Sequence, residues 1–274
     1  YAAHEEPNGI PGKLLNDVKA KSEAAGWKFV NEIAGGNANL QLDQVNKMVD
    51  DKPAAIVVVA QNGDSIVPAV KRANEAGIPV IATNRDINGG VFTNVVNNER
   101  QAGELQADYM AAHLPQNAKI VYIKGDMTIS AAVDRYEGFK EAIKAKRPDV
   151  EIVASNSTGD WSEAQGIREL SLWLNMYPQI DGVASANDNM AVGAIKAMKA
   201  AGRFNDSVIV CGVDSTDDAL ASIAAGEMKL TVKQDADKIV ETIMGLLQQV
   251  KQGQSPDKGN VLVPMIAITK DNLA

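Results

Sequence analysis

The stretch PVIATNRD, residues 79–86, decides the fold of this chain. Residues 80–82 form a short β-branched and apolar run, which is typical of a buried strand. Polar residues follow at once, among them Asn84 and Arg85. In open α/β sheets, ligands bind at the carboxyl ends of the strands. The stretch therefore predicts a strand of such a sheet, with an amide and a guanidinium placed where a ligand would bind.

Strand and helix patterns alternate from one end of the chain to the other. The runs that indicate buried strands lie at residues 55–60, 80–83, 119–124, 151–155, 182–186 and 208–213. Segments with helical spacing of apolar residues lie at 12–25, 40–50, 66–76, 99–113, 131–146, 162–177, 189–201 and 216–225. Such repeated units with short connections imply parallel strands and right-handed crossovers.

The alternation occurs twice, which favours two lobes in a chain of 274 residues. One set of units runs to about residue 95, and a second begins near residue 119 after a long helix. A last helix at 238–251 and a strand at 260–269 can return to the first lobe. We expect a first lobe of residues 1–97 and 235–262 and a second lobe of 98–234 and 263–274. Hinges near Asn97, Gln234 and Val263 are a hypothesis that follows from these bounds.

Composition excludes several classes of function. The chain is 45% hydrophobic and carries a formal charge of −8, so it lacks the basic surface that a nucleic-acid partner needs. No apolar run approaches the ~20 residues that cross a bilayer. A single cysteine, Cys211, excludes an intramolecular disulfide and is expected to be a small buried residue. No signal-peptide pattern is present, so we expect a mature or trimmed form.

Polar side chains stand at or just beyond several predicted strand ends. The hydroxyls of a sugar both donate and accept hydrogen bonds, so a site built from amides, carboxylates and arginines suits them, and a tryptophan face suits the C–H side of the sugar. These residues are Gln61, Asn84, Arg85, Arg135, Asn187, Asp214 and Gln234, with Trp161 entering a helix nearby.

Each of these residues also has a structural interpretation. Asn and Asp after strands commonly form turns and helix caps, and Asp188 and Asp217 are better interpreted as caps than as ligands. For Arg135, a surface position is the default. Enzyme motifs are not found: the chain has neither a Gly-rich phosphate loop nor a GxSxG elbow. His4 and His113 are the only histidines, and no His/Cys cluster offers a zinc site. We expect no enzyme activity, cofactor or metal.

Four segments, in the same order, resemble one known family over almost the whole chain. PVIATNRD resembles that family's PVITLDR strand end, and SAAVDRYEGFKEAI (130–143) its AAxxRxEGF segment. SANDNMAVGAIKAM (185–198) resembles QNDxMAxGAxxAL, and VIVCGVDSTDDAL (208–220) resembles VVGFDGTPD. The chain resembles the periplasmic sugar-binding proteins of ABC transporters, of the ribose-binding, type I group.

The resemblance implies an α/β fold of two similar doubly wound parallel-sheet lobes joined by a three-strand hinge. Carried over by position, the ligand-binding residues are Asn8, Gln61, Asn84 and Arg85 in the first lobe, Arg135, Trp161, Asn187 and Asp214 in the second, Gln234 at the hinge edge, and His4 near the end of the first strand. The family usually has Asp where Asn84 stands, and its ribose binders have two Phe where Ile10 and Pro11 stand. A one-sided stack on Trp161 would permit a smaller or acyclic polyol.

The function that this resemblance implies is that of a solute-binding protein of an ABC importer. It would bind a monosaccharide or related polyol in the interlobe cleft, close on its hinge and deliver the ligand to a membrane permease. A monomer is expected, in the periplasm or, anchored to the membrane, outside a Gram-positive cell. The alternatives are the effector-binding core of a LacI-type regulator, a receptor for a furanosyl signalling molecule, or an enzyme on the same layered fold.

Overall fold

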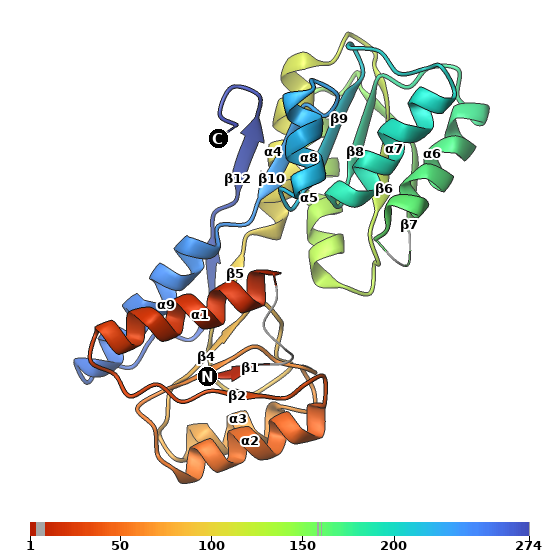
Figure 1. The fold of residues 1–274 in the computed structure, drawn as a ribbon. Coiled ribbons are helices and arrows are strands. Elements are labelled where there is room, and N and C mark those ends of the chain that lie inside the picture. The colour runs from red at the N-terminus through yellow and green to blue at the C-terminus, as the bar shows by residue number, and fades with distance from the viewer. Residues whose placement is uncertain (4–8, 158, 160, 274) are drawn as a thin grey trace. The chain divides into compact units, whose positions relative to one another are not determined.

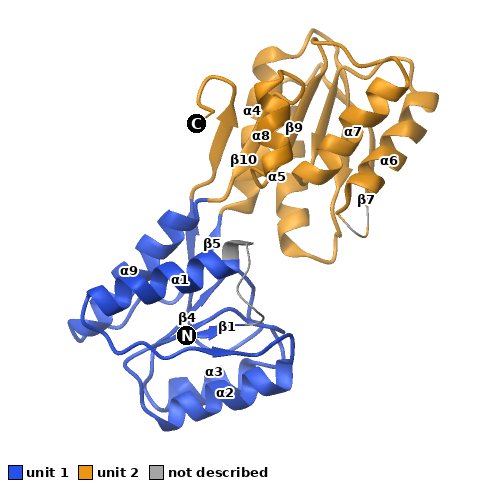
Figure 2. Cartoon of the chain, viewed as in Figure 1, with its two compact units in different colours: residues 1–97, 235–263 blue, residues 98–234, 264–274 orange. Residues whose placement is uncertain are grey.

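The computed structural model describes residues 1–3, 9–157, 159 and 161–273, without the side chains of residues 9 and 10. The chain divides into two compact units (Figure 2). Unit 1 comprises Tyr1–Asn97 and Asp235–Val263, and unit 2 comprises Asn98–Gln234 and Pro264–Ala274. The chain therefore passes from one unit to the other after Asn97, Gln234 and Val263.

Unit 1 contains a parallel sheet in the order β2-β1-β3-β4-β5-β11. Its strands are β1 (Ala2–Ala3), β2 (Glu32–Ile33), β3 (Ile56–Val58), β4 (Val80–Thr83), β5 (Thr93–Asn97) and β11 (Gly259–Val263). Its helices are α1 (Gly9–Ala24), α2 (Ala38–Asp50), α3 (Val67–Glu75) and α9 (Ala236–Lys251). Figure 1 shows helices on both sides of the sheet.

Side chains of the unit 1 strands alternate between two separate cores, as the period of two in a β-strand requires. Val57, Ile81 and Val95 pack with apolar residues of α1 and α9. Ile56 and Val80 point to the opposite face and pack with residues of α2 and α3. Both faces of the sheet are thus covered, which explains why its strands are apolar runs in the sequence.

Unit 2 contains a sheet in the order β7-β6-β8-β9-β10-β12. Its strands are β6 (Lys119–Lys124), β7 (Glu151–Ser157), β8 (Gly182–Ser185), β9 (Ile209–Val213), β10 (Leu230–Lys233) and β12 (Ile266–Thr269). Its helices are α4 (Glu99–His113), α5 (Ser130–Lys146), α6 (Glu163–Met176), α7 (Asp188–Ala200) and α8 (Asp217–Ala224). The first five strands in this order are parallel, and β12 pairs with β10 in the antiparallel sense.

The last strand differs from its prediction. The sequence predicts one strand over residues 260–269, whereas the structure contains β11 in one sheet and β12 in the other. Pro264 and Met265 separate the two strands. Proline has no backbone N–H and a fixed φ, so it interrupts a ladder and allows the chain to leave the sheet.

The strand order places a possible binding edge in each unit. In both sheets the first five strands, numbered along the unit, lie in the order 2-1-3-4-5, and the direction in which successive strands are added reverses between β1 and β3 and between β6 and β8. In doubly wound sheets, ligands bind beyond the carboxyl ends of the strands at this reversal point. The predicted fold class, two α/β lobes with parallel sheets, is confirmed.

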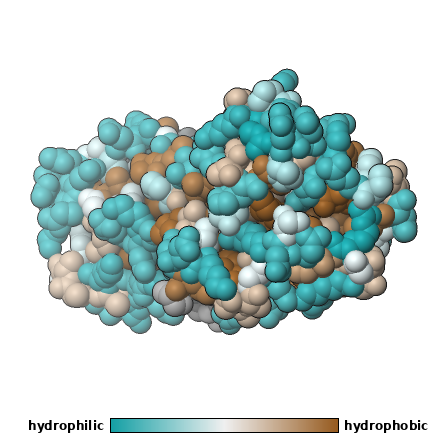
Figure 3. Space-filling model, turned by 90° about the horizontal axis from the view of Figure 1, so that it is seen from above, coloured by the Kyte–Doolittle hydropathy of each residue, from teal (hydrophilic) through white to brown (hydrophobic). Residues whose placement is uncertain are grey.

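Polar residues dominate the surface that faces the viewer in Figure 3, and hydrophobic residues show between them. Within the described ranges, no helix combines the length and the apolar character that crossing a membrane requires.

Candidate functional site

In unit 1, the loop after β3 is held by a buried glutamine of α2. Gln41 Nε2 donates a hydrogen bond to the Val59 carbonyl at 2.9 Å, and Gln41 Oε1 accepts one from the Gln61 N–H at 2.7 Å. The side-chain oxygen of Gln61 is itself buried and has no hydrogen-bond partner among the described residues. A buried oxygen without a donor costs free energy.

The next strand end in unit 1 presents Arg85. Asn84 follows β4 with a φ of +65°, a backbone region that Asn tolerates better than most residues. The turn brings the Arg85 N–H to the Thr83 carbonyl at 2.8 Å. The Arg85 side chain is exposed, and its Nη1 lies 3.5 Å from the Gln61 carbonyl. Gln61 and Arg85 therefore meet at the carboxyl edge of the unit 1 sheet.

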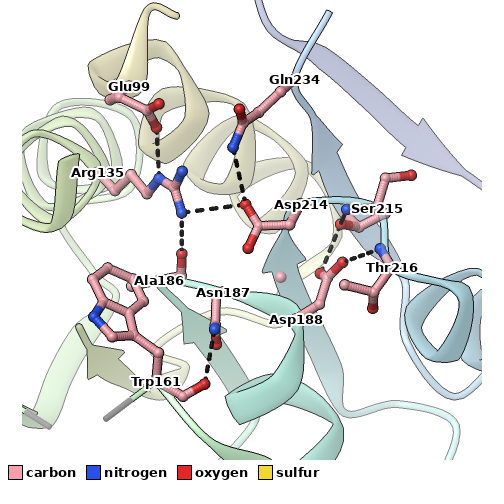
Figure 4. Close-up of polar contacts among 12 residues, drawn as sticks. Glu99, Arg135, Trp161, Ala186, Asn187, Asp188, Asp214, Ser215, Thr216 and Gln234 are labelled. Carbon is pink, nitrogen blue, oxygen red and sulfur yellow. Dashed lines mark hydrogen bonds and ion pairs between the residues drawn. The ribbon is translucent and has the colours of Figure 1, made fainter. Parts of the chain in front are cut away.

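In unit 2, Arg135 is a buried arginine that two groups hold in place (Figure 4). Its Nε donates to Glu99 Oε2 at 2.7 Å, and its Nη1 donates to the Ala186 carbonyl at 2.7 Å. Asp214 Oδ1 lies 3.6 Å from the same Nη1. Within the described part of the chain, Nη2 has no hydrogen-bond partner. The guanidinium is thus fixed in orientation with one nitrogen left to donate to a ligand.

A close crossing of α4 and α5 explains why Arg135 is buried. A Cβ on Gly103 of α4 would clash with the Arg135 carbonyl oxygen, and a Cβ on Gly138 of α5 would clash with the Arg100 carbonyl oxygen. The two glycines allow the helix backbones to touch. Glu99 and Arg135 lie about one turn before Gly103 and Gly138, so the crossing places their side chains together.

Asp214 and Gln234 complete this polar cluster from the ends of β9 and β10. Asp214 has a φ of +110°, a strained conformation for a residue with a side chain. Gln234 Nε2 donates to Asp214 Oδ1 at 3.3 Å, and the Asp214 side chain is 35% exposed. Desolvation raises the pKa of Asp214, Arg135 opposes this effect, and Glu99 adds to it. The carboxylate can reach a ligand while it remains beside Arg135.

Asp188 links the loop after β9 to β10 next to this cluster. Its Oδ1 accepts a hydrogen bond from Thr231 Oγ1 at 2.7 Å, and its Oδ2 accepts one from the Thr216 N–H at 2.8 Å. Gly212 leaves the room for this carboxyl, because a Cβ there would clash with Asp188 Oδ1. Burial raises the pKa of Asp188 to about 7. The side chain ties the loop that follows Asp214 to the sheet.

The prediction that Asp188 is a helix cap is wrong. The cap of α7 is Asn187, whose side-chain oxygen accepts from the Met190 N–H at 3.0 Å. Asp188 is instead the first residue of the helix, and its carboxyl points into the sheet contact described above. For α8, the cap is Thr216 and Asp217 is the first helical residue, so that cap prediction is wrong as well.

Asn187 also positions the aromatic residue of the unit 2 edge. Its Nδ2 donates to the Trp161 carbonyl at 2.9 Å, as Figure 4 shows. Trp161 has a φ of +57° and is half-buried. Its ring covers Gly125, where any Cβ would clash with the indole. The indole therefore lies at the end of β6, beside the reversal point of the sheet.

The structure brings the predicted residues together within each unit. Gln61, Asn84 and Arg85 share one edge in unit 1, and Arg135, Trp161, Asn187, Asp214 and Gln234 share one edge in unit 2. His4 and Asn8 lie outside the described residues. The prediction that Arg135 lies at the surface is wrong, because the close helix crossing buries its side chain. Sequence reasoning missed Gln41, Glu99 and the bridging role of Asp188, which no local pattern indicates.

The chemistry of these groups is that of hydrogen bonding. Arginine, amide and carboxylate groups together supply donors and acceptors for neutral hydroxyls. Among the described residues, no group of His, Cys, Asp or Glu side chains is arranged to hold a metal ion.

Comparison with known proteins supports the resemblance seen in the sequence. Residues 9–255 match the family model described as the periplasmic binding protein domain. A putative rhizopine-binding protein of Rhizobium meliloti is 33% identical over 96% of this chain and 83% of its own length. A xylitol-binding protein of Mycolicibacterium smegmatis is 30% identical over 96% of this chain and 74% of its own length.

A solved structure is similar as well. The crystal structure of an ABC transporter solute binding protein from Bacillus halodurans with bound myo-inositol has a TM-score of 0.78 and 28% identity. The similarity covers 99% of this chain and 94% of that one. The fold, the order of motifs and these matches agree: this chain belongs to the periplasmic binding protein family.

Proposed function

We propose that this protein binds a neutral monosaccharide or polyol as the solute-binding component of an ABC importer. The observation that carries the proposal is the unit 2 cluster, where Glu99 and the Ala186 carbonyl fix Arg135 and leave Nη2 to donate. Asp214, beside it, accepts. Neighbouring hydroxyls of a polyol need such a paired donor and acceptor.

Unit 1 supplies a second set of groups for the same ligand. Arg85 is an exposed donor, and it lies beside Asn84 and the Gln61 carbonyl. In the ligand-bound state, we propose that one ligand contacts both edges, so that binding favours a closed form of the two units. The closed form would then be recognised by a membrane permease. We place the protein in the periplasm or outside the cell, as a monomer that releases its ligand unchanged.

The ligand class follows from the residues at these edges and from the relatives. Of the three proteins named above, one is described as xylitol-binding and one has bound myo-inositol, both neutral polyols, and the third is a putative rhizopine-binding protein. Trp161 offers one aromatic face, and Asn84 supplies an amide that can both donate and accept. A small ring or an acyclic polyol fits one aromatic face, so we expect alditols, inositols and pentoses to bind better than larger sugars.

A thermal-shift screen over alditols, inositols, pentoses and hexoses tests the proposal. A ligand that binds the folded state at 100 times its Kd stabilises it by about 2.7 kcal/mol. For a chain of this size, that corresponds to a rise in Tm of roughly 5–10 °C. We expect at least one small neutral compound to give such a rise, and R85A to abolish it without lowering the Tm of the free protein. If no compound in the panel raised the Tm, the proposed function would be wrong.

A further inference from the structure

Arg135 lies between two carboxylates. Glu99 and Asp214 both approach its guanidinium, at 2.7 Å and 3.6 Å, and the Arg135 side chain is only 6% exposed. One positive and two negative charges leave the group with an excess negative charge when both carboxyls are ionised. Charges in a poorly solvated place interact more strongly than charges at a surface. A charged ligand at this edge of unit 2 would therefore interact with the excess negative charge of Glu99 and Asp214 over Arg135.

Glu99 is the less exposed of the two carboxylates and the less able to touch a ligand. Its side chain is 17% exposed, against 35% for Asp214. It is the first residue of α4, where the helix dipole favours a negative charge. Its contact with Nε holds the guanidinium plane, while the contact of Nη1 with the Ala186 carbonyl fixes the other side. Glu99 thus acts on a ligand through Arg135.

Other charged residues at this edge are arranged differently. Lys124, at the end of β6, has its ammonium 4.0 Å from the centre of the Tyr136 ring. Lys233, at the end of β10, is exposed. Among the described residues, the carboxylates that contact Arg135 are Glu99 and Asp214, and Asp188 interacts in turn with Asp214. Glu99 is the less exposed of the two that contact Arg135.

We propose that Glu99 is a positioning and specificity residue: it fixes the Arg135 guanidinium and supplies the negative charge that keeps the two arginines, Arg135 and Arg85, from attracting an anionic ligand. This inference rests on the proposed function and narrows its ligand class. A neutral polyol meets a donor nitrogen and an acceptor carboxylate at little electrostatic cost. The corresponding sugar acid brings a carboxylate whose attraction to Arg135 and Arg85 is offset by its repulsion from Glu99 and Asp214. The protein would therefore separate polyols from their acids, although both have similar shapes and hydroxyls.

Glu99→Gln tests the proposal because Gln keeps the shape and an acceptor for Nε but removes the charge. Glu104→Gln is the matched control, since Glu104 lies on the same helix and pairs at the surface with Arg100. The Kd values of xylitol and D-xylonate, and of D-ribose and D-ribonate, are measured by calorimetry for the wild type and both variants. We expect the ratio of the acid Kd to the neutral Kd to fall at least tenfold in E99Q. In E104Q the ratio should stay within twofold of the wild-type value.

A second readout needs no ligand. The Nε–H signal of Arg135 in a ¹H–¹⁵N spectrum should exchange with water at least tenfold faster in E99Q than in the wild type, because a charge-assisted hydrogen bond is lost. An unchanged ratio of the two Kd values, or tighter wild-type binding of an acid than of its polyol, would overturn the specificity role. An unchanged exchange rate would overturn the positioning role. If the wild type bound none of the four compounds but another neutral compound of the thermal-shift screen, the proposed function would stand and the ratio would be measured with that compound and its acid. If it bound no neutral compound of the screen, the proposed function and the specificity role would both fail, and the exchange rate would still decide the positioning role.

Discussion

Replacing Asp188 by Asn should change how the stability of unit 2 depends on pH. Asp188 is fully buried, and its pKa is raised from 3.8 to about 7, chiefly by desolvation. Because the folded state holds a proton that the unfolded chain releases above pH 4, the wild type should lose stability as the pH rises toward 7 and beyond. The amide side chain of D188N cannot titrate. It can still accept from the Thr216 N–H and donate to Thr231 Oγ1, so both contacts survive.

The size of the effect follows from the two pKa values. Between pH 5 and pH 8, an acid with a folded pKa near 7 and an unfolded pKa near 4 costs the folded state about 2.5 kcal/mol. The free energy of unfolding of D188N, minus that of the wild type at the same pH, should rise by this amount over that range. The stability that the proton on Asp188 gives to the folded state is fully present below about pH 4 and is lost as the pH rises through the folded pKa of about 7.

Urea unfolding at pH 5, 6, 7 and 8 measures this difference. Trp161 and Trp173 lie in unit 2 and Trp27 lies in unit 1, so a Trp27→Phe background makes the fluorescence report on unit 2. Asp217→Asn is a suitable control, because Asp217 is exposed. A difference that stayed constant within about 0.5 kcal/mol from pH 5 to pH 8 would refute the reasoning, since Asp188 would then titrate alike in both states.

Three further substitutions test the supports of the site. Gly103→Ala forces α4 and α5 apart, so circular-dichroism melts should show that the free energy of unfolding falls by about 3 kcal/mol. Gly245→Ala in α9, where a Cβ meets no atom within 4 Å, should raise that free energy by about 1 kcal/mol. Equal effects of the two substitutions would argue against the close crossing. Gln41→Leu leaves the Gln61 N–H and the Val59 carbonyl without partners, so urea unfolding should show a free energy of unfolding lower by about 2 kcal/mol, and ligand binding should weaken. Wild-type stability would show that the loop does not depend on Gln41. Gly125→Ala displaces the Trp161 ring and should weaken binding about tenfold in calorimetry; an unchanged Kd would remove Trp161 from the site.

Much of the fold could be predicted from the sequence because buried parallel strands are apolar on both faces. The runs at 80–83 and 119–124 coincide with β4 and β6. The strands β2 and β5 were not predicted. β2 has only two residues, and β5 has the sequence TNVVN, whose Asn94 and Asn97 are buried although they are polar. Only tertiary pairing with β4 and β11 makes that segment a strand.

The candidate site was predictable where it depends on strand ends and unpredictable where it depends on long-range contacts. Asn84, Asp214 and Gln234 follow strands, so a parallel sheet places them at one edge of their unit. Glu99 contacts Arg135 across 36 residues of sequence, and nothing near Glu99 indicates that partner. Asn187 and Asp188 are both good capping residues, and the sequence alone does not tell which one caps the helix. That these residues bind ligand stays a prediction.

The most direct test of the central claim is a calorimetric titration of the best ligand from the screen into the wild type, R85A and D214N. One variant changes the exposed guanidinium of unit 1, and the other changes the carboxylate of unit 2. If both units bind one neutral polyol, the wild type should bind one molecule per chain, and each variant should lose at least a hundredfold in affinity. Two molecules per chain, or wild-type affinity in either variant, would contradict the account.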